Sequence, residues 1–100
     1  MGEQQPGVII YSADPSNETV AKISVRGLGP DALHQLVRRV RNQGYFEGAR
    51  VAVTGVIDLT AGDNSGVEFS PPAPRPQAEA LGQLMAEAAG AESPEWCMAE

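Results

Sequence analysis

The chain has 100 residues, of which 42% are hydrophobic, and its formal net charge is −6 at pH 7. This length suits one domain with one hydrophobic core, and the acidic balance favours solubility and argues against a general affinity for nucleic acid or anionic lipid. No apolar run reaches the roughly 18 residues of a membrane span, and the start of the chain lacks the basic and apolar regions of a signal peptide. With Cys97 as the only cysteine, the sequence predicts a cytoplasmic protein without an internal disulfide.

The first quarter of the chain predicts a β-hairpin. Residues 8–13 form a short apolar run with the composition of a buried strand. Residues 19–27 alternate between apolar and polar side chains, which is typical of a strand with one face in water. Between the two strands, residues 14–17 read Asp-Pro-Ser-Asn, a composition that favours a turn.

Residues 31–43 are predicted to form an amphipathic helix. Pro30 and Asp31 suit the first turn of a helix, and Gly44 can adopt the left-handed conformation that often ends one. The apolar stripe of this helix, at the spacing that helices require, is Leu33, Leu36, Val37 and Val40. This central helix separates the first hairpin from the rest of the sheet.

The second half of the chain predicts another hairpin and a second helix. Residues 50–60 alternate again, with Gly55 indicating a bulge or a close backbone approach, and residues 67–69 form a short return strand after a loop at 61–66. Four prolines in residues 70–76 indicate a stiff connector without regular structure. Residues 77–89 are rich in helix formers, although Gly82 weakens this helix, and Gly90 ends it.

Together these elements predict an α+β fold with a small mixed four-stranded sheet in the order ββαββα. A helix between the second and third strands implies a crossover connection and therefore a mixed sheet. We expect residues 1–70 to form the core domain, 71–76 a proline-rich linker, and 77–100 a C-terminal helix and acidic tail that packs on the core or extends from it. An open sheet edge at residues 8–13 or 67–69 would allow a homodimer or a larger homo-oligomer.

Neither a catalytic site, nor a metal site, nor a cofactor site is predicted. Because His34 and Cys97 are the only residues of their types, neither a nucleophile with a base nor a zinc cluster is indicated. Residues 62–66 have the composition of a turn, not the ligand spacing of a calcium loop. The glycines of residues 27–30 precede a helix but lack a phosphate-binding pattern.

Two groups of residues are candidate interaction surfaces. The first is the polar face of the central helix, formed by His34, Arg38, Arg39 and Arg41. These side chains could simply be solvated, since the negative end of the helix dipole favours cations there. Alternatively they bind an acidic protein surface, a nucleic-acid backbone, or the acidic C-terminal segment of the same chain. The second group is Trp96 and Met98, which either pack on the core or dock on another protein.

These features predict a non-catalytic protein-interaction or regulatory module with a protein partner. One specific form is an acidic inhibitor of a nucleic-acid-binding complex, such as a phage anti-defence protein. An alternative is binding of nucleic acid or another anionic ligand through the arginines of the central helix. A further alternative is a small enzyme with a site at an oligomer interface, built from carboxylates such as Asp58 and Glu68.

Overall fold

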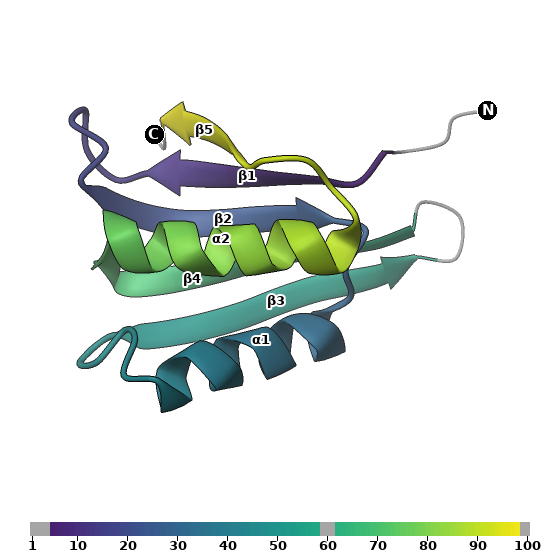
Figure 1. Ribbon diagram of the computed structural model, residues 1–100, viewed down its shortest axis with the longest axis horizontal. Coiled ribbons are helices and arrows are strands. Elements are labelled where there is room, and N and C mark those ends of the chain that lie inside the picture. The colour runs from purple at the N-terminus through teal and green to yellow at the C-terminus, as the bar shows by residue number, and fades with distance from the viewer. Residues whose placement is uncertain (1–4, 59–61, 99–100) are drawn as a thin grey trace.

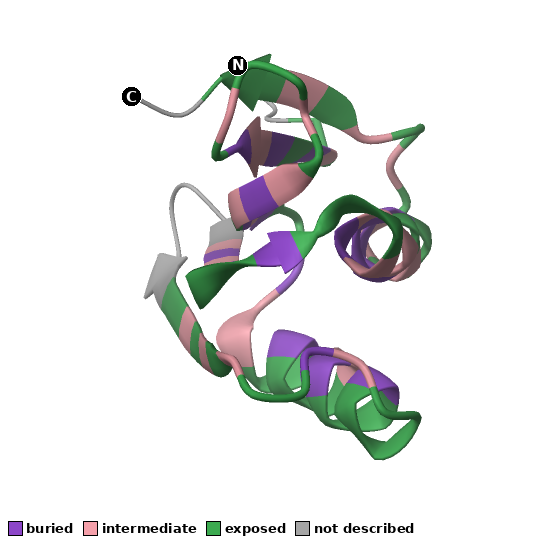
Figure 2. Cartoon of the chain, turned by 90° about the vertical axis from the view of Figure 1, so that its left-hand side faces the viewer, coloured by how far each residue is buried: buried purple, intermediate pink, exposed green. Residues whose placement is uncertain are grey.

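Five strands form one mixed sheet, and two helices pack on one of its faces (Figures 1 and 2). The structure is a computed structural model that describes residues 5–58 and 62–98, except for the side chains of residues 56–58, 62 and 63. The elements are β1 (Gly7–Ser12), β2 (Thr19–Arg26), α1 (Pro30–Asn42), β3 (Arg50–Asp58), β4 (Gly62–Pro74), α2 (Arg75–Ala89) and β5 (Glu95–Met98). None of the helices in these ranges has the length and apolar character needed to cross a membrane.

The prediction of an α+β fold with a mixed sheet is confirmed, but the predicted count of four strands is wrong. The sheet has the order β3-β4-β2-β1-β5, and the order of elements along the chain is ββαββαβ. The additional strand, β5, pairs in parallel with β1 and places Trp96 beside Ile10. Four residues are too few for side-chain periodicity to indicate a strand, so only the pairing with β1 reveals it.

Each helix connects two parallel strands that are not neighbours in the sheet. The helix α1 links β2 to β3, which lie on either side of β4, and α2 links β4 to β5 across β2 and β1. The two pairs of strands run in opposite directions, and their crossovers proceed in opposite directions across the sheet. Right-handed connections therefore bring both helices to the same face, as Figure 2 shows.

The hydrophobic core lies between this face of the sheet and the two helices. The fully buried side chains from both layers include Ile10, Ile23, Val67, Leu33, Leu81 and Met85. Gly82 of α2 is buried, and a Cβ atom there would lie 3.0 Å from Ile10 Cδ1. The glycine predicted to weaken α2 thus permits close packing of this helix on β1.

The proline-rich segment differs from the expected connector. Residues 70–74 continue β4, and α2 begins directly at Arg75. The register between β4 and β2 shifts between residues 68 and 73 of β4, so Pro71 and Pro72 lie in a bulged, exposed part of the strand. Prolines are tolerated at such bulges because the ladder is already interrupted there.

The loop between α1 and β3 is anchored by Phe46. Its ring is buried and lies 4.7 Å from the ring of Phe69, measured between centroids. Its backbone N–H donates a hydrogen bond of 2.8 Å to the side-chain oxygen of Gln77 at the start of α2. These contacts connect the end of α1 to β4 and α2, so the loop belongs to the core.

Gly55 lies where the start of α1 approaches the sheet. A Cβ atom at this position would lie 2.8 Å from Cβ of Pro30 and 3.0 Å from Cβ of Ser65. Ser65 in turn donates a 2.7 Å hydrogen bond from its hydroxyl to the carbonyl of Leu28. The pairing of β3 with β4 is regular at Gly55, so there is no bulge, and the close approach there is made by the side chains of Pro30, the first residue of α1, and Ser65.

We expect Gly55→Ala to lower the free energy of unfolding by about 1–3 kcal/mol, because Pro30 and Ser65 must move to admit the methyl group. The control is Gly7→Ala, since a Cβ at Gly7 meets no atom within 4 Å. Urea denaturation of both variants measures the difference. Equal stability of the two variants would contradict this packing.

The turn between β1 and β2 is organised by the carboxylate of Asp14. One oxygen accepts hydrogen bonds from the backbone N–H of Ser16 at 2.9 Å and of Glu18 at 3.3 Å, and the other accepts from the N–H of Thr19 at 3.1 Å. The hydroxyls of Ser16 and Thr19 also donate to it. The hydroxyl of Ser16 and then that of Thr19 are the main causes that lower the pKa of Asp14 well below its ordinary value of 3.8.

Because the folded-state pKa of Asp14 is lowered, its carboxylate stabilises the folded state above the ordinary pKa, and this contribution is lost as the pH falls toward the folded-state value. We therefore expect Asp14→Asn to be less stable than the parent protein above about pH 5, with a difference that shrinks below about pH 4. Urea denaturation curves recorded above about pH 5 and below about pH 4 measure this difference in stability, with Asp31→Asn as the control. A pH-independent difference would contradict the assignment.

Candidate interaction surface on the open face of the sheet

No described element covers the face of the sheet opposite the helices (Figure 2). Because side chains alternate along each strand, residues paired across strands share this face. One cross-strand row consists of Thr54, Gly66, Ser24, Ile9 and Glu95. The next row consists of Ala52, Glu68, Lys22, Tyr11 and Cys97. We call these two rows, together with Arg26 and Asn64, the open face.

The open face contains a groove of about 730 Å³. Gly66 lines the groove, and because it has no side chain it leaves the floor of the groove open. A Cβ atom at Gly66 would lie only 3.1 Å from the carbonyl oxygen of Ile23, so the position is tight for any larger residue. Arg26 and Asn64 pair across β2 and β4 toward one end, and Lys22 and Glu68 pair in the same way toward the other. The groove therefore crosses the central strands of the sheet.

The side chains in the groove combine apolar surface with both signs of charge. Ile9 is 37% exposed although it is a large hydrophobic residue in the middle of a strand. Tyr11 lies beside it along β1, and the ammonium group of Lys22 is 4.8 Å from the centre of the tyrosine ring. Glu68 is the cross-strand neighbour of Lys22, and Glu95 is that of Ile9. This composition suits contact with a partner of mixed polarity.

One carboxylate considered for catalysis, Glu68, lines the groove. The side chain of Asp58 is outside the described residues. His34 is exposed on α1, whereas the groove lies on the face of the sheet opposite the helices. Within residues 5–58 and 62–98, no group of three or more His, Cys, Asp or Glu side chains could hold a metal ion.

The predicted cationic face of the central helix is exposed in the structure. His34, Arg38, Arg39 and Arg41 all lie on the outer side of α1. Arg41 donates a hydrogen bond of 3.2 Å to the carbonyl of Ala49, next to the start of β3. Together the four residues form a second polar surface, separated from the open face by the sheet.

The two candidate residues of the C-terminal segment have different surroundings. Trp96 is half-buried on the helix side of β5, and the guanidinium of Arg75 lies 4.7 Å from the centre of its ring. Met98 is 53% exposed at the end of the strand. Trp96 therefore packs on its own chain, and Met98 remains accessible.

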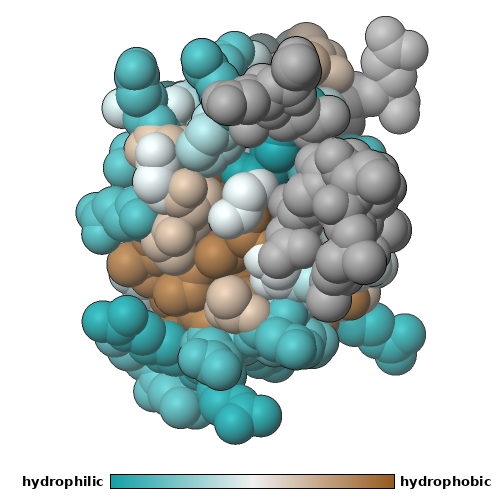
Figure 3. All heavy atoms as spheres, turned by 90° about the vertical axis from the view of Figure 1, so that its right-hand side faces the viewer, coloured by the Kyte–Doolittle hydropathy of each residue, from teal (hydrophilic) through white to brown (hydrophobic). Residues whose placement is uncertain are grey.

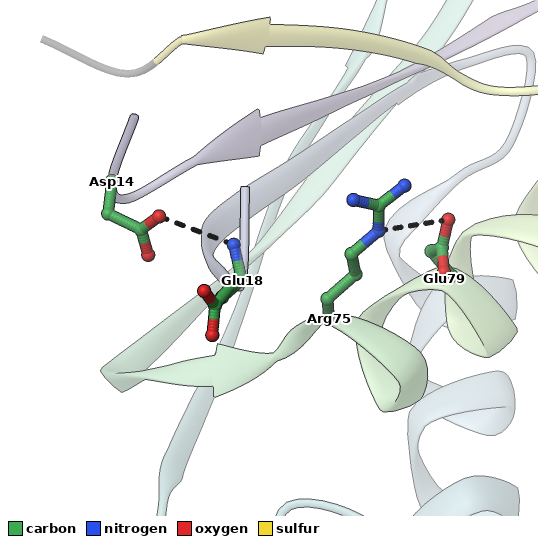
Figure 4. A network of polar contacts seen from close by, with 4 residues as sticks. All are labelled: Asp14, Glu18, Arg75 and Glu79. Carbon is green, nitrogen blue, oxygen red and sulfur yellow. Dashed lines mark hydrogen bonds and ion pairs between the residues drawn. The ribbon is translucent and has the colours of Figure 1, made fainter. Parts of the chain in front are cut away.

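Arg75, at the start of α2, contacts both Trp96 of β5 and the turn between β1 and β2. Figure 4 shows its ion pair with Glu79 and the hydrogen bond between Asp14 and Glu18 in the turn. The side chain of Arg75 forms an ion pair of 3.4 Å with Glu79, one turn along α2. Its backbone N–H donates a 2.9 Å hydrogen bond to the carbonyl of Glu18, whose own N–H is bound by Asp14. The turn, the start of α2 and Trp96 are thus held by one chain of contacts.

Apolar atoms also reach the surface at the end of the molecule where α1 begins and α2 ends (Figure 3). The buried core residue Leu28 lies two residues before α1, at this end of the molecule. This patch offers mainly apolar contact, whereas the groove adds charged groups that can orient a partner. The groove is therefore the stronger candidate site.

Most residues of the open face were not identified from the sequence. The alternation in residues 19–27 does place Lys22, Ser24 and Arg26 on a solvent-facing side of one strand. It does not show that Tyr11 and Glu68 lie on either side of Lys22, because strand order decides this. Alternation along a strand thus indicates which side chains of that strand share a face, but it does not indicate which strands are neighbours in the sheet.

Comparisons with known proteins found no match: no family model fits the chain, and no curated protein or solved structure is significantly similar to it.

We expect Trp96→Ala to lower the free energy of unfolding by about 1–3 kcal/mol, since a half-buried ring and its contact with Arg75 are lost. Amide hydrogen exchange of residues 95–98 should become faster than in the parent protein. Met98→Ala in the same strand is the control, and its effect should stay below about 0.5 kcal/mol. If both variants were equally stable, Trp96 would not be a packing residue.

Proposed function

We propose that this protein is a non-catalytic interaction module that binds another protein through the open face of its sheet. The observation that carries the proposal is the groove of about 730 Å³, in which Ile9 and Tyr11 are surrounded by charges of both signs. Protein interfaces commonly have an apolar centre with a polar rim. An accessible isoleucine beside a tyrosine supplies such a centre.

The charges of the groove favour a protein over a nucleic acid. Two cations, Lys22 and Arg26, are accompanied by the carboxylates Glu68 and Glu95. Carboxylates beside the cations repel phosphate groups, and the net charge of −6 adds to this repulsion. A polypeptide can instead present an acid to Lys22 and a base to Glu68, so that both are paired on binding.

The acidic character of the chain suggests the class of partner. A protein with a basic surface, such as one that binds nucleic acid, would be attracted to a chain of net charge −6. Binding there would occupy the surface that the partner uses for nucleic acid, so the module would act as an inhibitor. A single exposed cysteine, Cys97, is consistent with a reducing compartment, and we place this activity in the cytoplasm.

A second candidate function is supported by the cationic face of α1. Arg38 and Arg39 are exposed, and among the described residues neither of them takes part in the ion pair, which joins Arg75 and Glu79. Arginines in the last turns of a helix can bind phosphate or carboxylate groups in bidentate fashion. An anionic ligand on this surface would bind more weakly as salt is raised.

The two candidates are separated by capture of a partner from native lysate with three variants of the tagged protein. Ile9→Lys places a charge in the groove, Ala32→Lys places the same charge on the exposed side of α1, and the double variant R38A/R39A removes two cations. We expect Ile9→Lys to reduce the captured partner at least tenfold, because burying an unpaired ammonium in the interface costs on the order of 1.4 kcal/mol or more. Ala32→Lys should have no effect.

Thermal melting curves check that each variant is folded. Loss of the captured protein with R38A/R39A but not with Ile9→Lys would overturn the use of the open face. Capture of nucleic acid that is released at moderate salt, and lost in R38A/R39A, would establish the second candidate instead. Robust turnover of a small molecule that Ile9→Lys abolishes would contradict a non-catalytic function.

A further inference from the structure

The outer edge of β3 is the longest free edge of the sheet among the described strands. The strands at residues 7–12 and 62–74 both lie inside the sheet, so the predicted open edges at residues 8–13 and 67–69 are wrong. The edges are instead β3, with nine residues, and β5, with four. In Figure 2, α1 lies on the helix side of β3.

The composition of β3 does not protect this edge. Natural edge strands are usually short, or carry lysine, proline or an inward charge that prevents pairing with another chain. Residues 51–57 of β3 contain neither a charged residue nor a proline, and four of the seven are valine or isoleucine. By contrast, β5 is short, begins with Glu95 and directly follows Pro94. Among the described strands, none pairs with the outer side of β3.

The sequence of β3 is complementary to itself when read in the antiparallel direction. With Thr54 opposite Thr54 of a second copy, the strand aligns over its full length of residues 50–58. Arg50 then stands opposite Asp58 at both ends, and Val51 stands opposite Ile57. Opposite charges and β-branched residues are favourable cross-strand neighbours. A two-fold axis through Thr54 generates this arrangement, which is the usual symmetry of a homodimer.

We propose that two copies of the chain pair antiparallel through β3, with the two-fold axis at Thr54, and join their sheets into one. The axis is perpendicular to the sheet, so the helices of both copies lie on one side and both open faces lie on the other. This inference rests on the edge of β3 and not on what the open face binds. It adds a second copy of the chain as a partner.

A charge exchange tests the register. In a dimer of the Arg50→Asp variant, residues 50 and 58 carry like negative charges at both ends of the strand pair, and in a dimer of Asp58→Arg they carry like positive charges. We expect the dissociation constant of either homodimer to rise at least tenfold over the parent protein. When the two variants are mixed in equal amounts, both ends become complementary, and a heterodimer should form with nearly the parent affinity.

Sedimentation equilibrium measures the dissociation constants, and native mass spectrometry distinguishes the heterodimer by mass. The double variant R50D/D58R restores both charge pairs in one chain, so it should dimerise again and control for misfolding of the single variants. A parent protein that stays monomeric at several hundred micromolar would overturn the proposal. A dimer that is unaffected by either single variant, or variants that do not combine, would overturn the register. The Ile9→Lys variant should dimerise normally, which separates this test from that of the open face.

Discussion

The pairing of β4 with both β3 and β2 is the constraint on which the rest of the structure depends. Because β4 lies between two parallel strands, the connection from β2 to β3 has to pass over it, and α1 makes that crossover. The hydroxyl of Ser65 on β4 binds the carbonyl of Leu28, and Gly55 on β3 leaves space for Pro30. These contacts set where α1 begins on the sheet.

The same strand determines the position of α2 and of the C-terminus. β4 extends through its bulge to Pro74, and α2 starts at the next residue, so this helix returns directly across the sheet. Gly82 allows α2 to lie close to Ile10 of β1, where Pro94 also approaches. The chain then adds β5 to the free side of β1, and Trp96 lies against Arg75. The C-terminal segment thus adds the short edge strand β5 beside β1, and none of the described elements covers the face of the sheet opposite the helices.

Placing both helices on one face has a functional consequence. The open face presents neighbouring side chains from separate strands, which fixes Ile9, Tyr11, Lys22 and Glu68 on rigid backbone. Rigid strands hold such a surface with little loss of conformational entropy on binding. If two copies join through β3, their open faces lie on the same side, and a partner with two matching sites would gain affinity from both.

The sequence by itself determined the local elements, because they depend on neighbours within a few positions. Alternation predicted β2 and β3, helical spacing predicted α1, and the Asp-Pro-Ser-Asn composition predicted the first turn, which the carboxylate of Asp14 indeed organises. Helix formers predicted α2, although two residues of its start were assigned to the connector. The polar face of α1 with Arg38 and Arg39 was also readable, since it follows from the period of a helix.

Only the tertiary structure decided features that depend on pairing between distant segments. β5 and the proline-containing end of β4 are strands because β1 and β2 supply their hydrogen-bonding partners, and propensity does not report this. Trp96 and Met98 are close in sequence, but Trp96 packs against the core and under Arg75, whereas Met98 is exposed. The candidate site itself depends on strand order: residues 9, 22, 66 and 95 become neighbours only when β4, β2, β1 and β5 are placed side by side.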